Sequence, residues 1–137
     1  SIADRLKTIA SKNDVTINVS GEKTVINGIN YILDEIIYNL CENAVKYNKT
    51  GGEVNVFVGI EDNKPIIKVS DTGIGIPKDQ CSRIFERFYR VDKSHSRKIG
   101  GTGLGLSIVK HGAAFHNAHI EVNSKPGEGT VFTVVFD

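Results

Sequence analysis

Residues 100–107 read Gly100-Gly101-Thr102-Gly103-Leu104-Gly105-Leu106-Ser107, and their four glycines within six residues lead directly into an apolar helical pattern. Glycines leave backbone N–H groups free to close on an anion, and the start of the following helix attracts negative charge. The spacing is neither that of a P-loop nor the Gly-x-Gly-x-x-Gly of a Rossmann fold. The stretch therefore predicts a phosphate-binding segment in a nucleotide fold of another kind. A flexible glycine-rich hinge is the alternative if the segment is taken alone.

Outward from this stretch, the sequence pattern switches between strand and helix periodicity. It predicts strands at residues 15–19, 24–26, 53–60, 65–70, 120–123 and 130–136. It predicts helices over about 29–47, 78–88 and 104–115, with a polar loop over 89–99. The first two strands would form an edge hairpin, and the next two a second hairpin. Helices that interrupt hairpins without strict βαβ alternation favour an α+β sandwich, with helices layered on one face of a mixed or antiparallel sheet.

Length and composition narrow the class of protein. The 137 residues fit one domain, and a net charge of +1 with 24% charged residues argues against a nucleic-acid module. Cys41 and Cys81 form no CxxC pair or Cys/His cluster, so no disulfide framework or zinc site is expected. No apolar run reaches the length of a membrane span. Because the chain begins with Ser1 and contains no methionine, we expect it to be a piece of a longer protein.

The helix predicted over 29–47 carries a polar face beside its apolar stripe. Glu35, Asn39, Asn43 and Lys46 recur at steps of four, four and three residues. An Asn carbonyl is an oxygen ligand that Mg²⁺ accepts, and a lysine one turn later could meet phosphate oxygens. A solvated helix face with ordinary surface residues is the alternative.

Asp71 ends a predicted strand and opens the pattern Asp-x-Gly-x-Gly-Ile-Pro. The two glycines let another group approach the backbone closely beside a fixed carboxylate. A carboxylate accepts a hydrogen bond from the exocyclic amine of adenine, whereas it repels the carbonyl oxygen that guanine presents there. An Asx turn that caps a helix beginning after Pro77 is the alternative.

Five segments together resemble the catalytic ATP-binding domain of bacterial sensor histidine kinases, within the superfamily that includes gyrase, MutL and the Hsp-type chaperone ATPases. They are the N box at 39–47, the first glycine box at 71–77, the F box at 83–92, the second glycine box at 101–106 and the glycine-Thr element at 127–130. The match covers nearly the whole chain. It implies the Bergerat fold, a two-layer α/β sandwich in which about three helices cover one face of a mixed sheet of about five strands.

The resemblance also implies a role for individual residues. Asn43 would hold Mg²⁺, Asn39 would lie near the phosphates, Lys46 would contact phosphate, Tyr47 would flank the base, and Asp71 would bind the adenine amine. The rest of the implied nucleotide-binding set is Gly73, Gly75, Ile76, Gly101, Thr102, Gly103, Leu104, Gly105 and Thr130. Residues of about 89–101 would form an ATP lid. Arg87 and Arg90 are the two cations near it that we expect to act on the polyphosphate, together with Asn39 and Lys46 on the first long helix.

The reaction implied is donation of the ATP γ-phosphoryl group to a histidine. Where gyrase-like enzymes place a water-activating glutamate, this chain has Asn39, and an amide cannot act as a base. Its histidines are His95, His111, His116 and His119, and none lies in a phosphoacceptor motif. We therefore expect the acceptor in an upstream dimerisation domain, with residues 1–12 as the end of that region or a link to it and 13–137 as the catalytic domain.

The partners follow from the same resemblance. They are ATP, the parent protein's own phosphoacceptor domain and a downstream response regulator, with no nucleic acid. We expect the parent to be a homodimer anchored in the bacterial plasma membrane, with this domain in the cytoplasm. An ATP-dependent interaction module without catalysis and a self-contained ATPase are the alternative functions. The family usually has Gly-Gly where Asn117-Ala118 stand, but Asn tolerates the left-handed conformation of a helix end.

Overall fold

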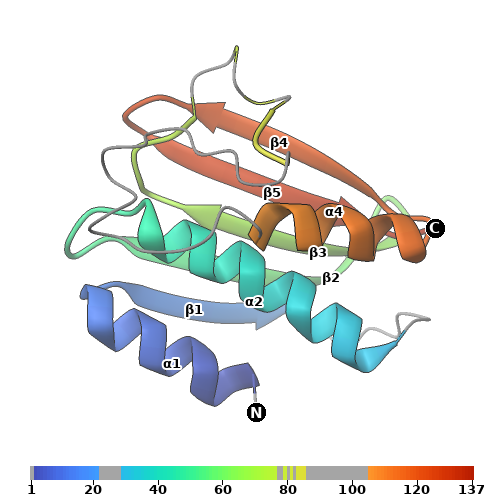
Figure 1. Cartoon of the computed structure of the whole chain (residues 1–137), viewed down its shortest axis with the longest axis horizontal. Helices are drawn as coiled ribbons and strands as arrows, with labels where there is room; N and C mark the ends of the chain where they lie inside the picture. Colours follow the sequence, from blue (N-terminus) through green and yellow to red (C-terminus); the bar gives the residue numbers. More distant parts are fainter. Residues whose placement is uncertain (1, 22–28, 77–78, 80, 82, 86–104) are drawn as a thin grey trace.

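The computed structural model describes residues 2–21, 29–76, 79, 81, 83–85 and 105–137. Over these residues, the chain forms two layers, with helices α1, α2 and α4 on one face of a five-stranded sheet (Figure 1). The strand order is β1-β2-β3-β5-β4, with β1 parallel to β2 and the other neighbours antiparallel. The predicted α+β sandwich with a mixed sheet is therefore confirmed.

Helix α2 (Asn30–Lys46) is the centre of the helical layer. Its apolar residues recur at helical spacing, and Ile36, Leu40 and Ala44 are at most 1% exposed. They pack on inward-facing side chains of the sheet, among them Val54, Val56, Ile67, Val69, Phe132 and Val134. The core therefore lies between α2 and the sheet, which fixes the position of the polar face of α2.

The N-terminal segment is helical as well. Helix α1 (Ile2–Asn13) buries Leu6 and Ala10 and packs on α2 and on β1 (Thr16–Gly21). The residues expected to be the end of an upstream region or a link to it are thus packed into the same core. Strand β1 lies at the sheet edge as predicted, but its described partner is the parallel strand β2. The expected hairpin partner, 24–26, lies outside the described residues.

The other two pairs of strands are hairpins, as predicted. Strands β2 (Glu53–Glu61) and β3 (Lys64–Asp71) are joined by Asp62 and Asn63, which have φ of 52° and 65°. Two consecutive positive φ angles are the signature of a type I′ turn, and Asp and Asn tolerate them. Strands β4 (His119–Lys125) and β5 (Gly129–Val135) close the chain.

Helix α4 (Gly105–Phe115) packs against α2, and Asn117 after it has a φ of 56°, which is the left-handed conformation expected there. The helix predicted over 78–88 is described only in part. Of its residues, Cys81 and 83–85 are in turns, and Ile84 is buried. The polar loop at 89–99 lies outside the described residues. In the part of the chain that is described, no helix is both long and apolar enough to cross a membrane.

Candidate functional site

Asp71 lies at the end of β3 and is fixed by two backbone N–H groups. Its Oδ1 accepts hydrogen bonds from the N–H of Gly73 at 2.8 Å and from that of Thr130 at 3.3 Å. The first bond is the Asx turn of the alternative interpretation. The second comes from β5 and is not part of any local turn. The carboxylate is therefore held both from the loop after β3 and from β5, which an Asx turn alone does not require.

Burial raises the pKa of the Asp71 carboxyl, and the two N–H donors, Gly73 and Thr130, partly offset this. Both bonds that the carboxylate accepts from described residues go to Oδ1. Oδ2 is thus the oxygen available to a donor group on a ligand. A half-buried carboxylate whose Oδ1 already accepts two hydrogen bonds can accept a further one at Oδ2 from a neutral amine.

The loop after Asp71 passes close to the end of α2. A Cβ on Gly73 would collide with the carbonyl oxygen of Tyr47, so only glycine fits there. The same carbonyl accepts a hydrogen bond from the N–H of Ile74 at 3.1 Å. On the other side of the loop, the N–H of Gly127 donates to the carbonyl of Ile74 at 2.8 Å. The first glycine box is therefore held between α2 and the β4–β5 turn.

A serine that the sequence motifs do not mark completes this arrangement. The hydroxyl of Ser124 accepts a hydrogen bond from the N–H of Ile76 at 2.6 Å and lies 2.8 Å from the hydroxyl of Thr130. Gly75 has a φ of 74°, and a Cβ there would collide with the carbonyl of Lys125. Asp71, Gly73, Gly75, Ile76 and Thr130 are thus brought together, whereas Ser124 carried no signal in the sequence beyond its place in a strand.

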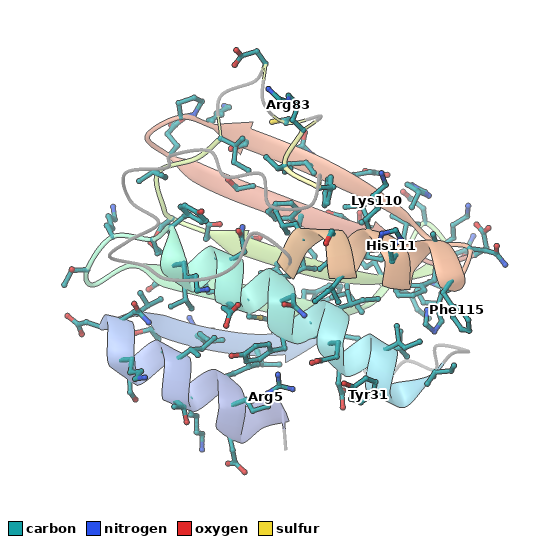
Figure 2. All side chains as sticks on the ribbon, in the orientation of Figure 1. Arg5, Tyr31, Arg83, Lys110, His111 and Phe115 are labelled. Carbon is teal, nitrogen blue, oxygen red and sulfur yellow. The ribbon has the colours of Figure 1, made fainter. Side chains whose placement is uncertain are left out.

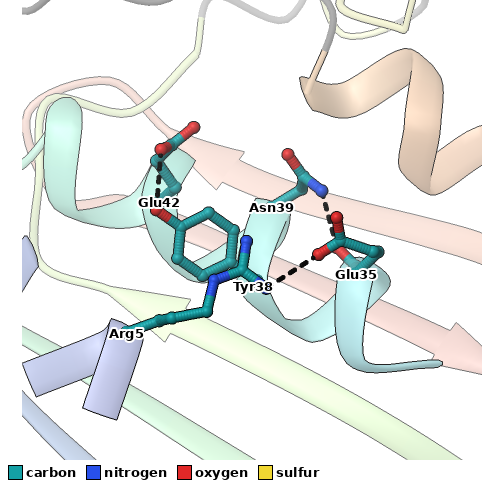
Figure 3. A network of polar contacts seen from close by, with 5 residues as sticks. All are labelled: Arg5, Glu35, Tyr38, Asn39 and Glu42. Atoms are coloured by element: carbon teal, nitrogen blue, oxygen red, sulfur yellow. Dashed lines mark hydrogen bonds and ion pairs between the residues drawn. The ribbon is translucent and has the colours of Figure 1, made fainter. Parts of the chain in front are cut away.

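The polar face of α2 leads away from this loop. The side-chain N–H of Asn39 donates to the carbonyl of Glu35 at 2.7 Å, as Figure 3 shows, and the residue is only 8% exposed. A Cβ added to Gly105, the first residue of α4, would lie 3.2 Å from Asn39 Oδ1. Asn39 therefore faces the start of α4, where the positive end of the helix dipole lies.

Asn43 and Lys46 differ in their surroundings. The half-buried side chain of Asn43 makes no hydrogen bond to any described residue, while its backbone carbonyl accepts one from the N–H of Tyr47 at 3.1 Å. Lys46 Nζ lies 3.4 Å from Glu42 Oε1. The sequence analysis assigned Lys46 to phosphate and did not predict its pair with Glu42, although Glu at i and Lys at i+4 is a known stabilising pair on a helix. Tyr47 joins the two parts of the site, because its backbone contacts both Asn43 and the glycine box.

Several predicted site residues lie outside the described part of the chain. They are Arg87, Arg90, Gly101, Thr102, Gly103 and Leu104. Figure 2 shows His111 on α4, and the two histidines that follow this helix are His116 and His119. His95 belongs to the undescribed residues. The described site thus consists of the loop after Asp71, the end of α2 and the start of α4.

A separate hollow of about 450 Å³ lies over β3, β5 and β4 on the sheet face away from the helices. Its lining includes Lys68, Thr133 and Glu121, which are adjacent across three strands. The lining shares no residue with the site at Asp71. We take the residues around Asp71 as the candidate site, because the glycine loop and the fixed carboxylate meet there and Tyr47 connects them to the end of α2.

Comparison with known proteins shows the family to which the chain belongs. The profile described as "Histidine kinase-, DNA gyrase B-, and HSP90-like ATPase" matches residues 28–137. The sensor-like histidine kinase SenX3 of Mycolicibacterium smegmatis is 50% identical over 103 residues, which are 75% of this chain and 27% of SenX3. The chain thus spans about a quarter of the length of that relative.

Two solved structures share the fold at somewhat lower identity. The mycobacterial sensor histidine kinase MprB superposes with a TM-score of 0.83 at 28% identity, covering 98% of this chain and 92% of the other. Full-length ShkA, solved in complex with AMPPNP, gives a TM-score of 0.81 at 27% identity, covering 98% and 28%. The chain belongs to the family of histidine kinase-, DNA gyrase B- and HSP90-like ATPases, as an ATP-binding catalytic domain of the sensor histidine kinase type.

Proposed function

We propose that this domain binds Mg-ATP with the adenine at Asp71 and the phosphates between α2 and α4, and donates the γ-phosphoryl group to a histidine on another domain. The observation that carries the proposal is the Asp71 carboxylate, which two backbone N–H groups hold at one oxygen. That the related protein ShkA was solved with AMPPNP, a nucleotide analogue, agrees with it.

Adenine selectivity follows from the chemistry of the carboxylate. An ionised Asp71 only accepts hydrogen bonds, so it pairs with the exocyclic amine of adenine and repels the oxygen of guanine at the same position. The glycine loop is held on both sides by Tyr47 and Gly127. An adenine base would therefore meet a carboxylate that is already positioned, and the free energy of binding would not be reduced by the entropy cost of ordering this loop.

The α2 face suits a hard cation and phosphate. Asn43 offers a half-buried amide oxygen that no described side chain uses, which fits a Mg²⁺ ligand. No cluster of three or more His, Cys, Asp or Glu side chains able to hold a metal occurs among the described residues. The ion would therefore take most of its ligands from phosphate oxygens and water, and when bound it would neutralise phosphate charge. Asn39 would position the phosphates and could not activate water.

We assign the phosphoacceptor to another domain because none of the chain's histidines lies in a phosphoacceptor motif, and two of the described ones, His116 and His119, already have partners within the fold. His116 donates from Nδ1 to the carbonyl of Gly112 at 2.7 Å and accepts from the N–H of Ile29 at Nε2 at 3.1 Å. His119 pairs with Glu121 at 3.0 Å. We place the acceptor histidine in a dimerisation domain of a homodimeric, membrane-anchored parent, and a response regulator downstream. These are inferences from the family.

Calorimetric titration of the wild type and of Asp71→Asn with ATP and GTP tests the binding mode. We expect the wild type to prefer ATP, and Asp71→Asn to weaken ATP binding by about ten- to hundred-fold, as loss of one charge-assisted hydrogen bond costs about 1.5–3 kcal/mol. Asp62→Asn, in the turn between β2 and β3, is the matched control and should bind ATP as the wild type does. Equal wild-type affinities for ATP and GTP would contradict the assignment of Asp71.

A further inference from the structure

Glu42 is the residue next to Asn43 on α2, and its two carboxylate oxygens have different partners. Oε1 lies 3.4 Å from Lys46 Nζ, and the two side chains are 30% and 21% exposed. Oε2 accepts a hydrogen bond from the hydroxyl of Tyr38 at 3.1 Å (Figure 3). The carboxylate is therefore held by a neutral donor on one side and faces the lysine of the site on the other.

Tyr38 is itself held in place from helix α1. The Arg5 guanidinium lies 3.8 Å from the centre of the Tyr38 ring, and Arg5 Nη1 lies 3.1 Å from Glu35 Oε2. Burial and the charge of Glu42 raise the pKa of the Tyr38 hydroxyl, so it stays protonated and donates at neutral pH. The ring and its hydroxyl are thus fixed at both ends, which restrains Glu42.

This arrangement has a consequence for phosphate binding. A partly exposed Lys–Glu pair at 3.4 Å is weak, so Lys46 can readily exchange Glu42 for another anion. Because Tyr38 holds the far oxygen of Glu42, the carboxylate does not follow Lys46 when the ammonium turns to a phosphate. Binding of phosphate at Lys46 then breaks the Glu42–Lys46 pair. The negative charge of Glu42, one helical turn from Lys46, is left unpaired near the phosphate and repels it.

We propose that Glu42 is a positioning residue that competes with the nucleotide phosphates for Lys46 and so sets the affinity of the site for polyphosphate. The inference rests on the proposed function, because it takes Lys46 as a phosphate contact. It adds a determinant of affinity that acts on the phosphates and leaves adenine recognition untouched. Through Tyr38 and Arg5 it also connects the site to helix α1.

The test is a double-mutant cycle read by calorimetric binding of Mg-ATP and of adenosine. Glu42→Gln keeps the size of the side chain and an oxygen for Tyr38 but removes the charge. We expect it to bind Mg-ATP about two- to five-fold more tightly than the wild type and adenosine equally well. In a Lys46→Gln background, the same change should have no effect on Mg-ATP. Glu121→Gln, which breaks the exposed pair with His119, is the control and should change neither affinity.

The outcomes separate this inference from the proposed function. If the wild type binds both ligands and Glu42→Gln leaves Mg-ATP affinity unchanged or weakens it, the competition is wrong while nucleotide binding stands. A gain that persists in the Lys46→Gln background would also overturn it, because the effect would then not pass through Lys46. A wild type that binds neither ligand would overturn the proposed function and this inference together. Thermal unfolding of each variant shows that it is folded.

Discussion

At the scale of single residues, two opposed effects act on the pKa of the Asp71 carboxyl. Its position at the end of β3 buries the carboxylate and raises its pKa, while Gly73 and Thr130 donate hydrogen bonds that favour the charged form. The two donors thus act against the effect of burial on the carboxyl. A group of this kind is available to a ligand donor without prior rearrangement, and that is the property the proposed adenine contact needs.

The buried thiol of Cys41 leads us to predict that the free energy of unfolding falls at alkaline pH. Burial among the core side chains raises the pKa of its thiol to about 12. From about pH 9 upward, the unfolded chain loses this proton before the folded chain does, so the free energy of unfolding falls by up to about 1.4 kcal/mol per pH unit until about pH 12. The contribution is fully present below pH 9 and is lost above it.

Denaturant unfolding of Cys41→Ala at pH 8 and pH 10.5 checks this. The variant should be less stable than the wild type at pH 8, and the difference should shrink by at least about 1 kcal/mol at pH 10.5, because only the wild type carries the titrating thiol. Val45→Ala, a buried change on the same helix, controls for general alkaline destabilisation, and its deficit should not depend on pH. A constant deficit for Cys41→Ala would contradict the buried thiol.

At the scale of elements, α1 packs as part of the same core as α2. Leu6 is 6% exposed and Ala10 9%, and Ile9 packs against the core as well. We expect Leu6→Ala to lower the free energy of unfolding by about 2–4 kcal/mol, since a buried leucine is lost and a cavity is left. Lys7→Ala, on the exposed side of the same helix, should change it by less than about 0.5 kcal/mol. Equal small effects in urea unfolding would mean that α1 is not part of the cooperative unit.

The sequence predicted the elements whose signal is local. Ile36, Leu40 and Ala44 define α2 by their spacing, and Asp62-Asn63 define a tight hairpin turn. The candidate site residues Asp71, Gly73 and Gly75 could be selected from the sequence for the same reason, because the carboxylate and the glycines lie within five residues. These features needed no knowledge of which distant segments meet.

The features that the sequence did not predict depend on distant contacts. Strand β1 was assigned to a hairpin, whereas its described partner is β2, parallel and more than thirty residues later; the local pattern does not encode that pairing. Residues 1–12 were expected to be the end of an upstream region or a link to it. Helix α1 itself was not predicted, although Leu6 and Ala10 at i and i+4 were a usable helical signal. The contacts of Ser124 with Ile76 and Thr130 become visible only when the strands are assembled.

At the scale of the whole molecule, the topology brings three chain segments to one end of the sandwich. The end of α2, the end of β3 and the β4–β5 turn lie on the same side in Figure 1, and backbone hydrogen bonds of Ile74 to Tyr47 and Gly127 join them. The adenine and phosphate parts of the proposed site are thus set by packed elements. The parts that would act on the γ-phosphate, including Arg87 and Arg90, belong to the undescribed residues.

The most direct test of the account is phosphoryl transfer from labelled Mg-ATP, with this chain alone and with the parent protein's dimerisation domain added as a separate polypeptide. Alone, the chain should neither label itself nor hydrolyse ATP appreciably, because Asn39 cannot activate water and none of the chain's histidines lies in a phosphoacceptor motif. With the partner, acid-labile and base-stable label should appear slowly on the partner, since the two are no longer tethered, and Asn43→Ala should abolish it. Robust self-labelling of this chain that disappears on replacing His95, His111, His116 or His119 would contradict the account.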